Sequence, residues 1–215
     1  MTTKSQEPVI TSIEDLPITE SKWVTLKRIN FTDQTGKART WESAVRKTRS
    51  AAAGVDAVAM GNILLPKPRT EGQPASTMLV IQYRPPLDSW TVEWPAGLVD
   101  AGETAEQAAR REFKEETGYE VSRVLSVSPP QAADPGMTNA NMQLVMVEAE
   151  VPTAGGGDMP AQRLDDGEHI QRVVIPLAEL YATLEEYSKK DRFIVAAKLF
   201  HFAAGMEFMR TQKYF

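Results

Sequence analysis

The sequence contains no cysteine, which excludes disulfides, thiolate metal sites and cysteine nucleophiles. Long apolar runs are also missing. No stretch approaches the ~18 apolar residues needed to cross a bilayer, and residues 1–8 are polar where a secretory signal would be apolar. We therefore expect no membrane association and a cytoplasmic location, with the nucleus as the alternative compartment.

Runs of lysine and arginine are likewise absent. The chain has 24 basic and 29 acidic residues, a net charge of −5, and none of the basic runs that follow a nucleic-acid backbone. A long nucleic-acid ligand is therefore disfavoured. A small anionic ligand is not, because a metal ion or a pair of arginines can reverse the electrostatic field inside a cleft.

The chain is long enough for one substantial core, since 42% of its 215 residues are hydrophobic. We predict an N-terminal tail and β segment over residues 1–52 and a catalytic domain over residues 53–215. Strand-like stretches with a few helical ones between them indicate an α/β fold layered around a mixed sheet. Predicted strands cover residues 23–29, 38–45, 55–65, 77–83, 91–94, 121–127, 142–151 and 169–175; predicted helices cover 104–117, 177–187 and 192–209; residues 153–158 form a glycine-rich loop.

The helix predicted over residues 104–117 has clear signals at both ends. Thr104, followed three residues later by Gln107, forms a capping box, and the segment is followed by Gly118, a typical residue after a helix C-terminus. The existence of this helix is therefore predicted from local sequence alone.

Three acidic side chains of this helix share one side with its alanines. At ~100° per residue, Glu112, Glu115 and Glu116 fall within about 100° of one another. An ordinary surface helix turns its alanines inward and its carboxylates outward. Clustered carboxylates repel one another and are costly to desolvate without a cation, so the pattern predicts a divalent metal ion such as Mg²⁺. The alternative is a solvated acidic helix in which Arg111 pairs with Glu115.

A longer pattern favours the metal site. Gly97, five further residues, Glu103, seven further residues and then residues 111–119 (Arg-Glu-Phe-Lys-Glu-Glu-Thr-Gly-Tyr) match every fixed position of the Nudix box. The chain thus resembles the Nudix hydrolases. This resemblance implies an α/β/α sandwich, Mg²⁺ bound through helix carboxylates with Mn²⁺ as a substitute, and hydrolysis of a nucleoside diphosphate linked to another group.

The resemblance also assigns metal ligands. Glu112 and Glu116 become the main ligands, Glu115 a further or water-mediated ligand, and Ala96 a ligand through its backbone carbonyl. Glu112 and Glu115 are expected to be catalytic for the same reason. Arg111 is expected to orient a glutamate and not to touch the substrate.

Beyond the box, the chain looks like the eukaryotic ADP-ribose and ADP-sugar pyrophosphatases from Trp23 onward. The likeness rests on residues 22–24, 40–43, 82–86 and 134–136, and Pro135 follows the box at the spacing typical of the ADP-ribose subfamily. It implies hydrolysis of ADP-ribose and related ADP-sugars to AMP and a sugar 5-phosphate. It also implies a homodimer in which N-terminal strands cross to the partner.

The substrate site implied by this resemblance combines aromatic, acidic and basic side chains. Two tryptophans would stack on the adenine, and two arginines would bind the phosphates. The expected substrate-binding residues are Trp23, Trp41, Glu42, Arg46, Arg84, Leu98, Asp134 and Met137. Without the resemblance, a core or interface position for each tryptophan and a surface salt bridge for an arginine, Arg46 above all, are the more ordinary interpretations.

Hydrolysis also needs a base for the attacking water, and a carboxylate on a mobile loop suits this role. Residues 165–168 (Asp-Asp-Gly-Glu) offer three carboxylates. The resemblance singles out Glu168 as catalytic, whereas the residues alone do not separate it from Asp165 and Asp166. Two rival functions stay open. One is a Nudix enzyme for dinucleoside polyphosphates or oxidised nucleotides, and the other is a non-catalytic ADP-ribose sensor, against which the intact acidic set argues.

Overall fold

A computed structural model describes residues 7–49, 54–68, 72–152 and 159–212. The loop predicted over residues 153–158, and the boundary placed between residues 52 and 53, lie outside these ranges. No helix within the described ranges is both long enough and apolar enough to span a membrane.

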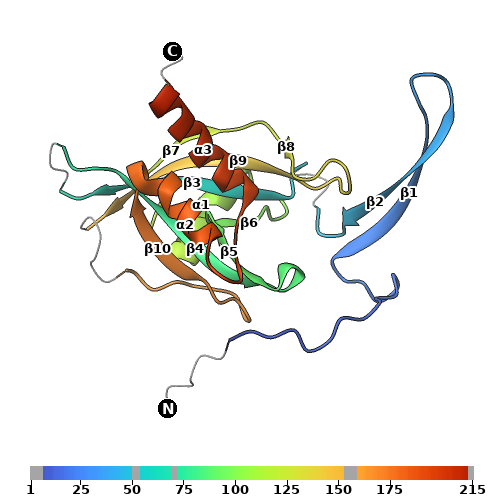
Figure 1. Ribbon diagram of the computed structural model, residues 1–215, viewed down its shortest axis with the longest axis horizontal. Helices are drawn as coiled ribbons and strands as arrows, with labels where there is room; N and C mark the ends of the chain where they lie inside the picture. The colour runs from blue at the N-terminus through green and yellow to red at the C-terminus, as the bar shows by residue number, and fades with distance from the viewer. Residues whose placement is uncertain (1–6, 50–53, 69–71, 153–158, 213–215) are drawn as a thin grey trace.

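Strands dominate the chain and three α-helices are interspersed among them (Figure 1). The strands are β1 (Val24–Thr32), β2 (Ala38–Arg46), β3 (Ala57–Pro66), β4 (Ser76–Arg84), β5 (Ser89–Glu93), β6 (Ala96–Leu98), β7 (Arg123–Val127), β8 (Gln131–Ala132), β9 (Asn141–Val151), β10 (Gln171–Pro176) and β11 (Phe193–Val195). The helices are α1 (Ala105–Thr117), α2 (Leu180–Ser188) and α3 (Ala197–Gln212), with short 3₁₀ turns at Pro85–Leu87 and Leu177–Glu179.

The body of the protein is built on one mixed sheet. Its strands run in the order β11-β5-β4-β3-β9-β7, with β10 paired to β4, β6 to β3 and β8 to β9. The pairs β3·β9 and β5·β11 are parallel and the others are antiparallel. The mixed sheet predicted from the sequence is confirmed.

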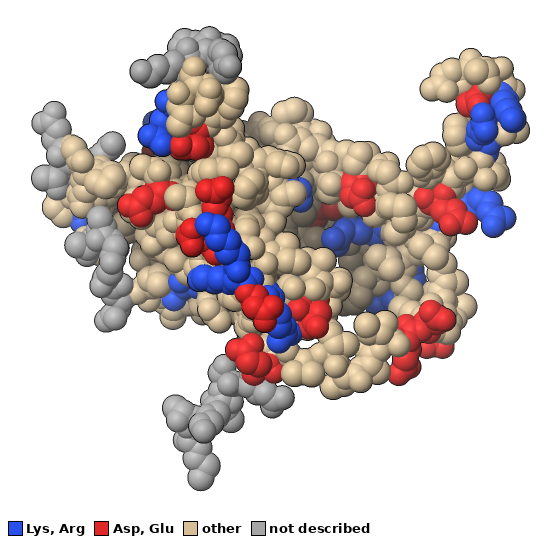
Figure 2. All heavy atoms as spheres, viewed as in Figure 1, with Lys and Arg blue, Asp and Glu red and all other residues tan. Residues whose placement is uncertain are grey.

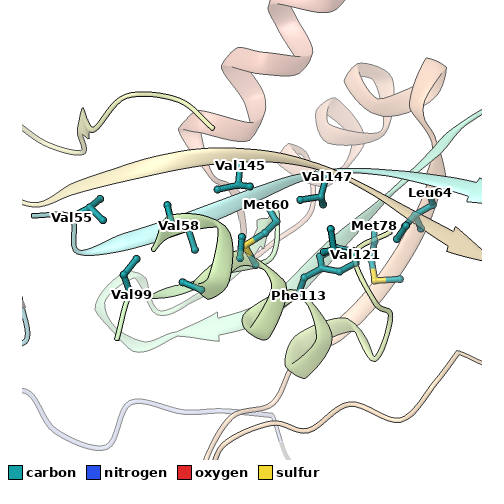
Figure 3. Packing of buried hydrophobic residues seen from close by; sticks show 14 of the residues in the cluster. Val55, Val58, Met60, Leu64, Met78, Val99, Phe113, Val121, Val145 and Val147 are labelled. Carbon is teal, nitrogen blue, oxygen red and sulfur yellow. The ribbon is translucent and has the colours of Figure 1, made fainter. Parts of the chain in front are cut away.

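Each face of the sheet is covered by helix. On one face α1 packs through Phe113 onto a cluster that includes Met60, Met78 and Val145 (Figure 3). On the other face α2 and α3 cover a second cluster, to which Trp94 and Leu184 belong. Two hydrophobic cores separated by a sheet make an α/β/α sandwich, as expected.

The sheet is partly open between β3 and β4, because these two neighbours pair only at Leu64 and Ser76. The gap is bridged by Asn62, which is 1% exposed. Its side-chain oxygen accepts from the Met78 amide at 2.7 Å and its nitrogen donates to the Met78 carbonyl at 2.9 Å. One buried side chain thus replaces a missing pair of backbone hydrogen bonds.

Strands β1 and β2 form a separate two-stranded sheet that extends away from the body as an arm (Figure 1). Its turn is fixed by Asp33, whose Oδ1 accepts from the amides of Thr35 and Lys37 at 2.9 and 3.0 Å, while Gly36 takes the left-handed conformation at φ +80°. Hydrogen bonds from the Thr35 hydroxyl and the Arg39 guanidinium, with those from the two amides, hold the pKa of Asp33 well below its usual value. The antiparallel N-terminal segment predicted from the sequence is confirmed.

The arm is tied to the body by one ion pair. Arg49, which follows β2, donates to both carboxylate oxygens of Asp56 at 2.7 and 2.6 Å. Asp56 is 5% exposed; its amide donates to the Asn141 side chain, and its Oδ2 accepts from the Asn141 amide on β9. The Arg49–Asp56 pair therefore fixes the end of the arm, just after β2, against the body.

The helix predicted over residues 192–209 is wrong at its start. Arg192 has φ +55°, outside the α-helical region, and residues 193–195 pair with β5 as strand β11. The apolar run Phe193-Ile194-Val195 satisfies the backbone groups of the sheet edge, and α3 begins only at Ala197. Pairing with the distant strand β5 has therefore outweighed the helical pattern of residues 193–195.

Candidate active site

Helix α1 has the ends that the sequence predicts. Thr104 accepts from the Gln107 amide while the Gln107 side chain accepts from the Thr104 amide, and Gly118 caps the C-terminus at φ +78°. The buried face includes Glu116, which is 5% exposed beside Ala108 and Ala109. A wholly solvated acidic helix is therefore wrong.

Strand β6 brings the chain directly against this helix. A Cβ atom at Gly97 would lie 1.9 Å from Cδ of Glu112, so a side chain of any size there would collide with the carboxylate. The amide of Ala96 donates to Oε2 of Glu116 at 3.1 Å. Short strand and helix together hold two carboxylates at fixed positions.

These two carboxylates are poorly solvated. Burial raises the pKa of Glu116 to about 8, against the opposing hydrogen bond from Ala96. Burial also raises the pKa of Glu112, and the charge of Glu168 acts in the same direction on both groups. The loop carboxylate of Glu168 therefore adds to the negative charge around them. An additional cation would relieve all three.

Arg111 is the cation that now serves this cluster. It donates to both oxygens of Glu103, at 2.9 and 2.8 Å. It also donates to Glu112 at 2.8 Å, to Glu115 at 3.2 Å and to the carbonyl of Leu98 at 3.0 Å. Because its N–H groups point to α1 and β6, Arg111 orients the carboxylates of Glu103, Glu112 and Glu115.

A cavity beside the loop of Glu168 carries a basic side chain. Arg84, at the end of β4, pairs with Glu93 of β5 at 2.9 Å. Arg84 and Glu168 both line a cavity of about 730 Å³, together with Tyr83, Trp90 and residues of the 164–171 loop. Figure 2 shows a hollow between the body and the arm, with basic side chains inside it. Glu168, whose charge acts on Glu112 and Glu116, thus shares this cavity with Arg84, an arrangement that suits a metal ion and a phosphorylated ligand.

The remaining expected residues lie on or beside the arm. Trp41 donates from Nε1 to the carbonyl of Gly136 at 2.9 Å, and the Ala44 amide donates to the carbonyl of Met137. These bonds place β2 beside the loop of Asp134. Glu42 lies next to Trp41 on the same strand, and Arg46 ends that strand.

The two tryptophans do not face each other within one chain. Trp41 pairs with Ile29, whereas Trp23 precedes β1 by one residue, so six residues, about 20 Å of extended chain, separate their positions. Trp23 is 68% and Trp41 54% exposed. The alternative that they are buried core residues is therefore wrong.

A divalent metal fits the chemistry of this site. The candidate ligands are carboxylate oxygens, which hard cations prefer, and they include no thiol or imidazole. Within the described ranges, no three His, Asp or Glu side chains already converge on one point as a formed metal site. Glu112, Glu116 and Glu115 are the residues that would hold the ion, and Glu112 and Glu115 would give up part of their bonding to Arg111.

Comparison with known proteins agrees with this geometry. Residues 61–197, more than half of the chain, match the family described as NUDIX domain. The chain belongs to the Nudix family. The glutamates of α1 and the strand β6 that faces them are thus the Nudix box of this protein.

Several relatives of this Nudix protein span most of its length. It is 39% identical to an uncharacterised Nudix hydrolase of Schizosaccharomyces pombe, covering 94% of this chain and 95% of the relative. It is 41% identical to an ADP-ribose pyrophosphatase of Saccharomyces cerevisiae (80% and 71%) and 32% identical to an ADP-sugar pyrophosphatase of Mus musculus (92% and 87%). A crystal structure titled ADP compounds hydrolase shares the fold, with a TM-score of 0.55, 20% identity and 98% coverage of both chains.

Two site residues were not anticipated from the sequence. Glu93 holds Arg84 in place, and the alternation of Thr91 and Glu93 on one face of β5 is the signal that could have revealed it. Gly97 was noted as part of the box, but its role in admitting Glu112 follows only from the approach of β6 to α1.

Proposed function

We propose that this Nudix protein hydrolyses the diphosphate of ADP-ribose and related ADP-sugars, giving AMP and a sugar 5-phosphate such as ribose 5-phosphate. The observation that carries the proposal is the desolvated pair Glu112 and Glu116, together with Glu168, whose charge acts on both and which lines a cavity with Arg84. The names of the yeast and mouse relatives support the ADP-sugar class.

The proposed cofactor is Mg²⁺, with Mn²⁺ able to substitute. Glu112, Glu116, Glu115 and the Ala96 carbonyl would hold it. When bound, such an ion neutralises phosphate charge and lowers the pKa of coordinated water. The chain's own contribution is to fix the carboxylates: Gly97 admits Glu112, and Arg111 orients Glu112 and Glu115.

We further propose that Glu168 accepts the proton of the attacking water. Its carboxylate now accepts from the Asp165 amide at 3.1 Å, in a turn that includes Gly167 at φ +85°. Exchanging this local hydrogen bond for one to water would put a base beside Glu112 and Glu116. The water oxygen then forms a bond to one phosphorus, the bridging P–O bond breaks, and the bridging oxygen leaves with the other phosphate.

Substrate recognition is proposed to involve Trp23, Trp41, Glu42, Arg46, Arg84, Leu98, Asp134 and Met137. Two rings that enclose a base lie about 7 Å apart, twice a stacking distance. The spacing of about 20 Å along the arm therefore favours a base held between Trp23 of one copy and Trp41 of another. A homodimer with exchanged arms, residues 1–52, around the catalytic domains, residues 53–215, meets this requirement.

The deciding experiment is product analysis after incubation of the full chain with ADP-ribose and Mg²⁺. We expect AMP and ribose 5-phosphate in equal amounts. Glu112→Gln should lower kcat at least about a thousandfold with an unchanged melting temperature, because one carboxylate charge is lost from the metal site. Glu120→Gln, which removes an exposed ion pair with Lys114, is the matched control.

Each rival function predicts a different result in this assay. Faster turnover of diadenosine polyphosphates or oxidised nucleotides than of ADP-ribose would replace the proposed substrate. Tight binding of ADP-ribose with no products at any metal concentration would indicate a sensor.

A further inference from the structure

Lys198 stands at the edge of the proposed phosphate site, on a helix outside the Nudix box. Strand β11 pairs with β5 through Val195 and Val92, and the Ala196 amide donates to the Val92 carbonyl at 3.0 Å. Helix α3 therefore starts where β5 ends. Lys198, in its first turn, is thereby brought close to Glu93, whose negative charge acts directly on its ammonium.

Glu93 is the shared neighbour of this region. It accepts from Arg84 at 2.9 and 3.3 Å, it attracts Lys198, and its charge also reaches Glu116. Glu93, the last residue of β5, thus acts through its charge on the cations Arg84 and Lys198 and on the acidic Glu116. Lys198 is consequently on the side of the site where a phosphate would approach the arginines.

Lys198 and Arg46 lack direct counter-ions. Within the part of the chain that the structure describes, neither forms an ion pair or a side-chain hydrogen bond. Burial lowers the pKa of Lys198, and the positive charge of Arg46 acts in the same direction. Two like charges held near each other, with Arg84 already committed to Glu93, leave a local excess of positive charge that an anion would stabilise.

We propose that Lys198 is a further substrate-binding residue, whose ammonium binds the diphosphate together with Arg46 and Arg84. This inference rests on the proposed function, because it names a residue for the same diphosphate. The flexible lysine stem suits a point contact to a phosphate oxygen beside the planar guanidinium groups. Glu93 keeps Arg84 in place until the phosphate arrives.

The test compares a ligand that carries a diphosphate with one that lacks it. Calorimetry with Mg²⁺ present would measure binding of α,β-methylene ADP, which cannot be hydrolysed between its phosphates, and of adenosine. For Lys198→Met we expect affinity for the diphosphate to fall about tenfold, because a charge-assisted hydrogen bond is lost, with adenosine binding unchanged. KM for ADP-ribose should rise by a similar factor.

Two further variants separate a binding role from a structural one. Lys198→Arg should restore diphosphate affinity to within about threefold of wild type, since the charge is retained. Lys189→Met, which removes an exposed lysine paired with Glu186, should change neither ligand's affinity.

Failure of the inference can be told from failure of the proposed function. If wild-type protein turns over ADP-ribose and Lys198→Met binds the diphosphate as tightly, Lys198 is not a ligand contact. Equal weakening of diphosphate and adenosine would mean a structural role and would also overturn the inference. A wild type that neither turns over ADP-ribose nor binds the analogue would overturn both.

Discussion

The body and the arm of this protein hold their candidate site residues in opposite ways. In the body, the glutamates of α1 lie against a sheet, and Arg111 alone joins four residues of the site. On the arm, Trp23 and Trp41 are mostly exposed, and the β1–β2 sheet contributes nothing to either hydrophobic core. One half of the site is rigid before any ligand binds, and the other is not enclosed.

This contrast indicates which parts of the site a single chain completes. A two-stranded sheet is marginal by itself, and exposed tryptophan, leucine and isoleucine side chains on it favour a further contact. Chemistry and recognition should therefore respond differently to mutation. Changes in the body should lower turnover within each chain, whereas changes on the arm should weaken binding and depend on a second copy.

After Glu112→Gln, the largest effect is expected for Gly97→Ala in the body. The added Cβ would lie 1.9 Å from Cδ of Glu112, so the carboxylate must move away. A displacement of this size at a reacting centre lowers kcat about a hundredfold. Steady-state kinetics with ADP-ribose would measure it. Gly205→Ala, with no atom within 4 Å of its Cβ, is the control and should leave kcat unchanged.

Smaller effects are expected for Trp23→Ala and Trp41→Ala on the arm. Loss of one stacking face should raise KM about tenfold and leave the melting temperature nearly unchanged, because neither ring is buried. The same kinetic assay applies.

Mixing the two tryptophan variants sharpens the comparison. If each site combines Trp23 of one copy with Trp41 of the other, a mixed dimer contains one site with both tryptophans. Co-expressed variants, purified through two different tags, should then recover a low KM in about half of the sites. Recovery of none would place both tryptophans within one chain and contradict the exchanged arms.

The smallest effect concerns the junction of arm and body. Hydrogen bonds from Arg49 lower the pKa of Asp56, while burial opposes them. The folded-state pKa is thus below the unfolded value, so the stabilisation is present above pH about 4 and is lost as the pH falls further. Asp56→Asn should cost about 2 kcal/mol of unfolding free energy at pH 7, and less in acid.

Denaturant unfolding of wild type and Asp56→Asn between pH 3 and pH 7 would measure this difference. Glu186→Gln, which breaks an exposed pair with Lys189, should cost no more than about 0.5 kcal/mol at any pH. A constant gap between wild type and Asp56→Asn across this range would contradict the ionised pair.

Local signals explain what the sequence predicted well. Helix α1 was predicted because its cap residues, Thr104, Gln107 and Gly118, lie within the segment that they bound. The inward position of Glu116 followed from helical spacing beside alanines. The arm was predicted for a similar reason, since the Asp33–Gly36 turn and its flanking strands are adjacent in sequence.

Features that depend on distant segments were missed or misjudged. Strand β11 requires the free edge of β5, about a hundred residues earlier, and a three-residue strand has no period of its own. A salt bridge was thought more ordinary for Arg46 than for Arg84, yet it is Arg84 that pairs with Glu93. Strand pairing decides which of the two arginines lies beside a carboxylate. The residue types alone do not predict that pairing.

The opening between β3 and β4 restricts what position 62 can be. The Asn62 amide supplies one acceptor and one donor to Met78, at a reach that fits the width of the gap. Aspartate would lose the donor, leucine would lose both groups, and glutamine would be one methylene too long. A buried asparagine in the middle of an apolar strand therefore indicates where this sheet opens. The same pattern can be sought in related sequences that have no solved structure.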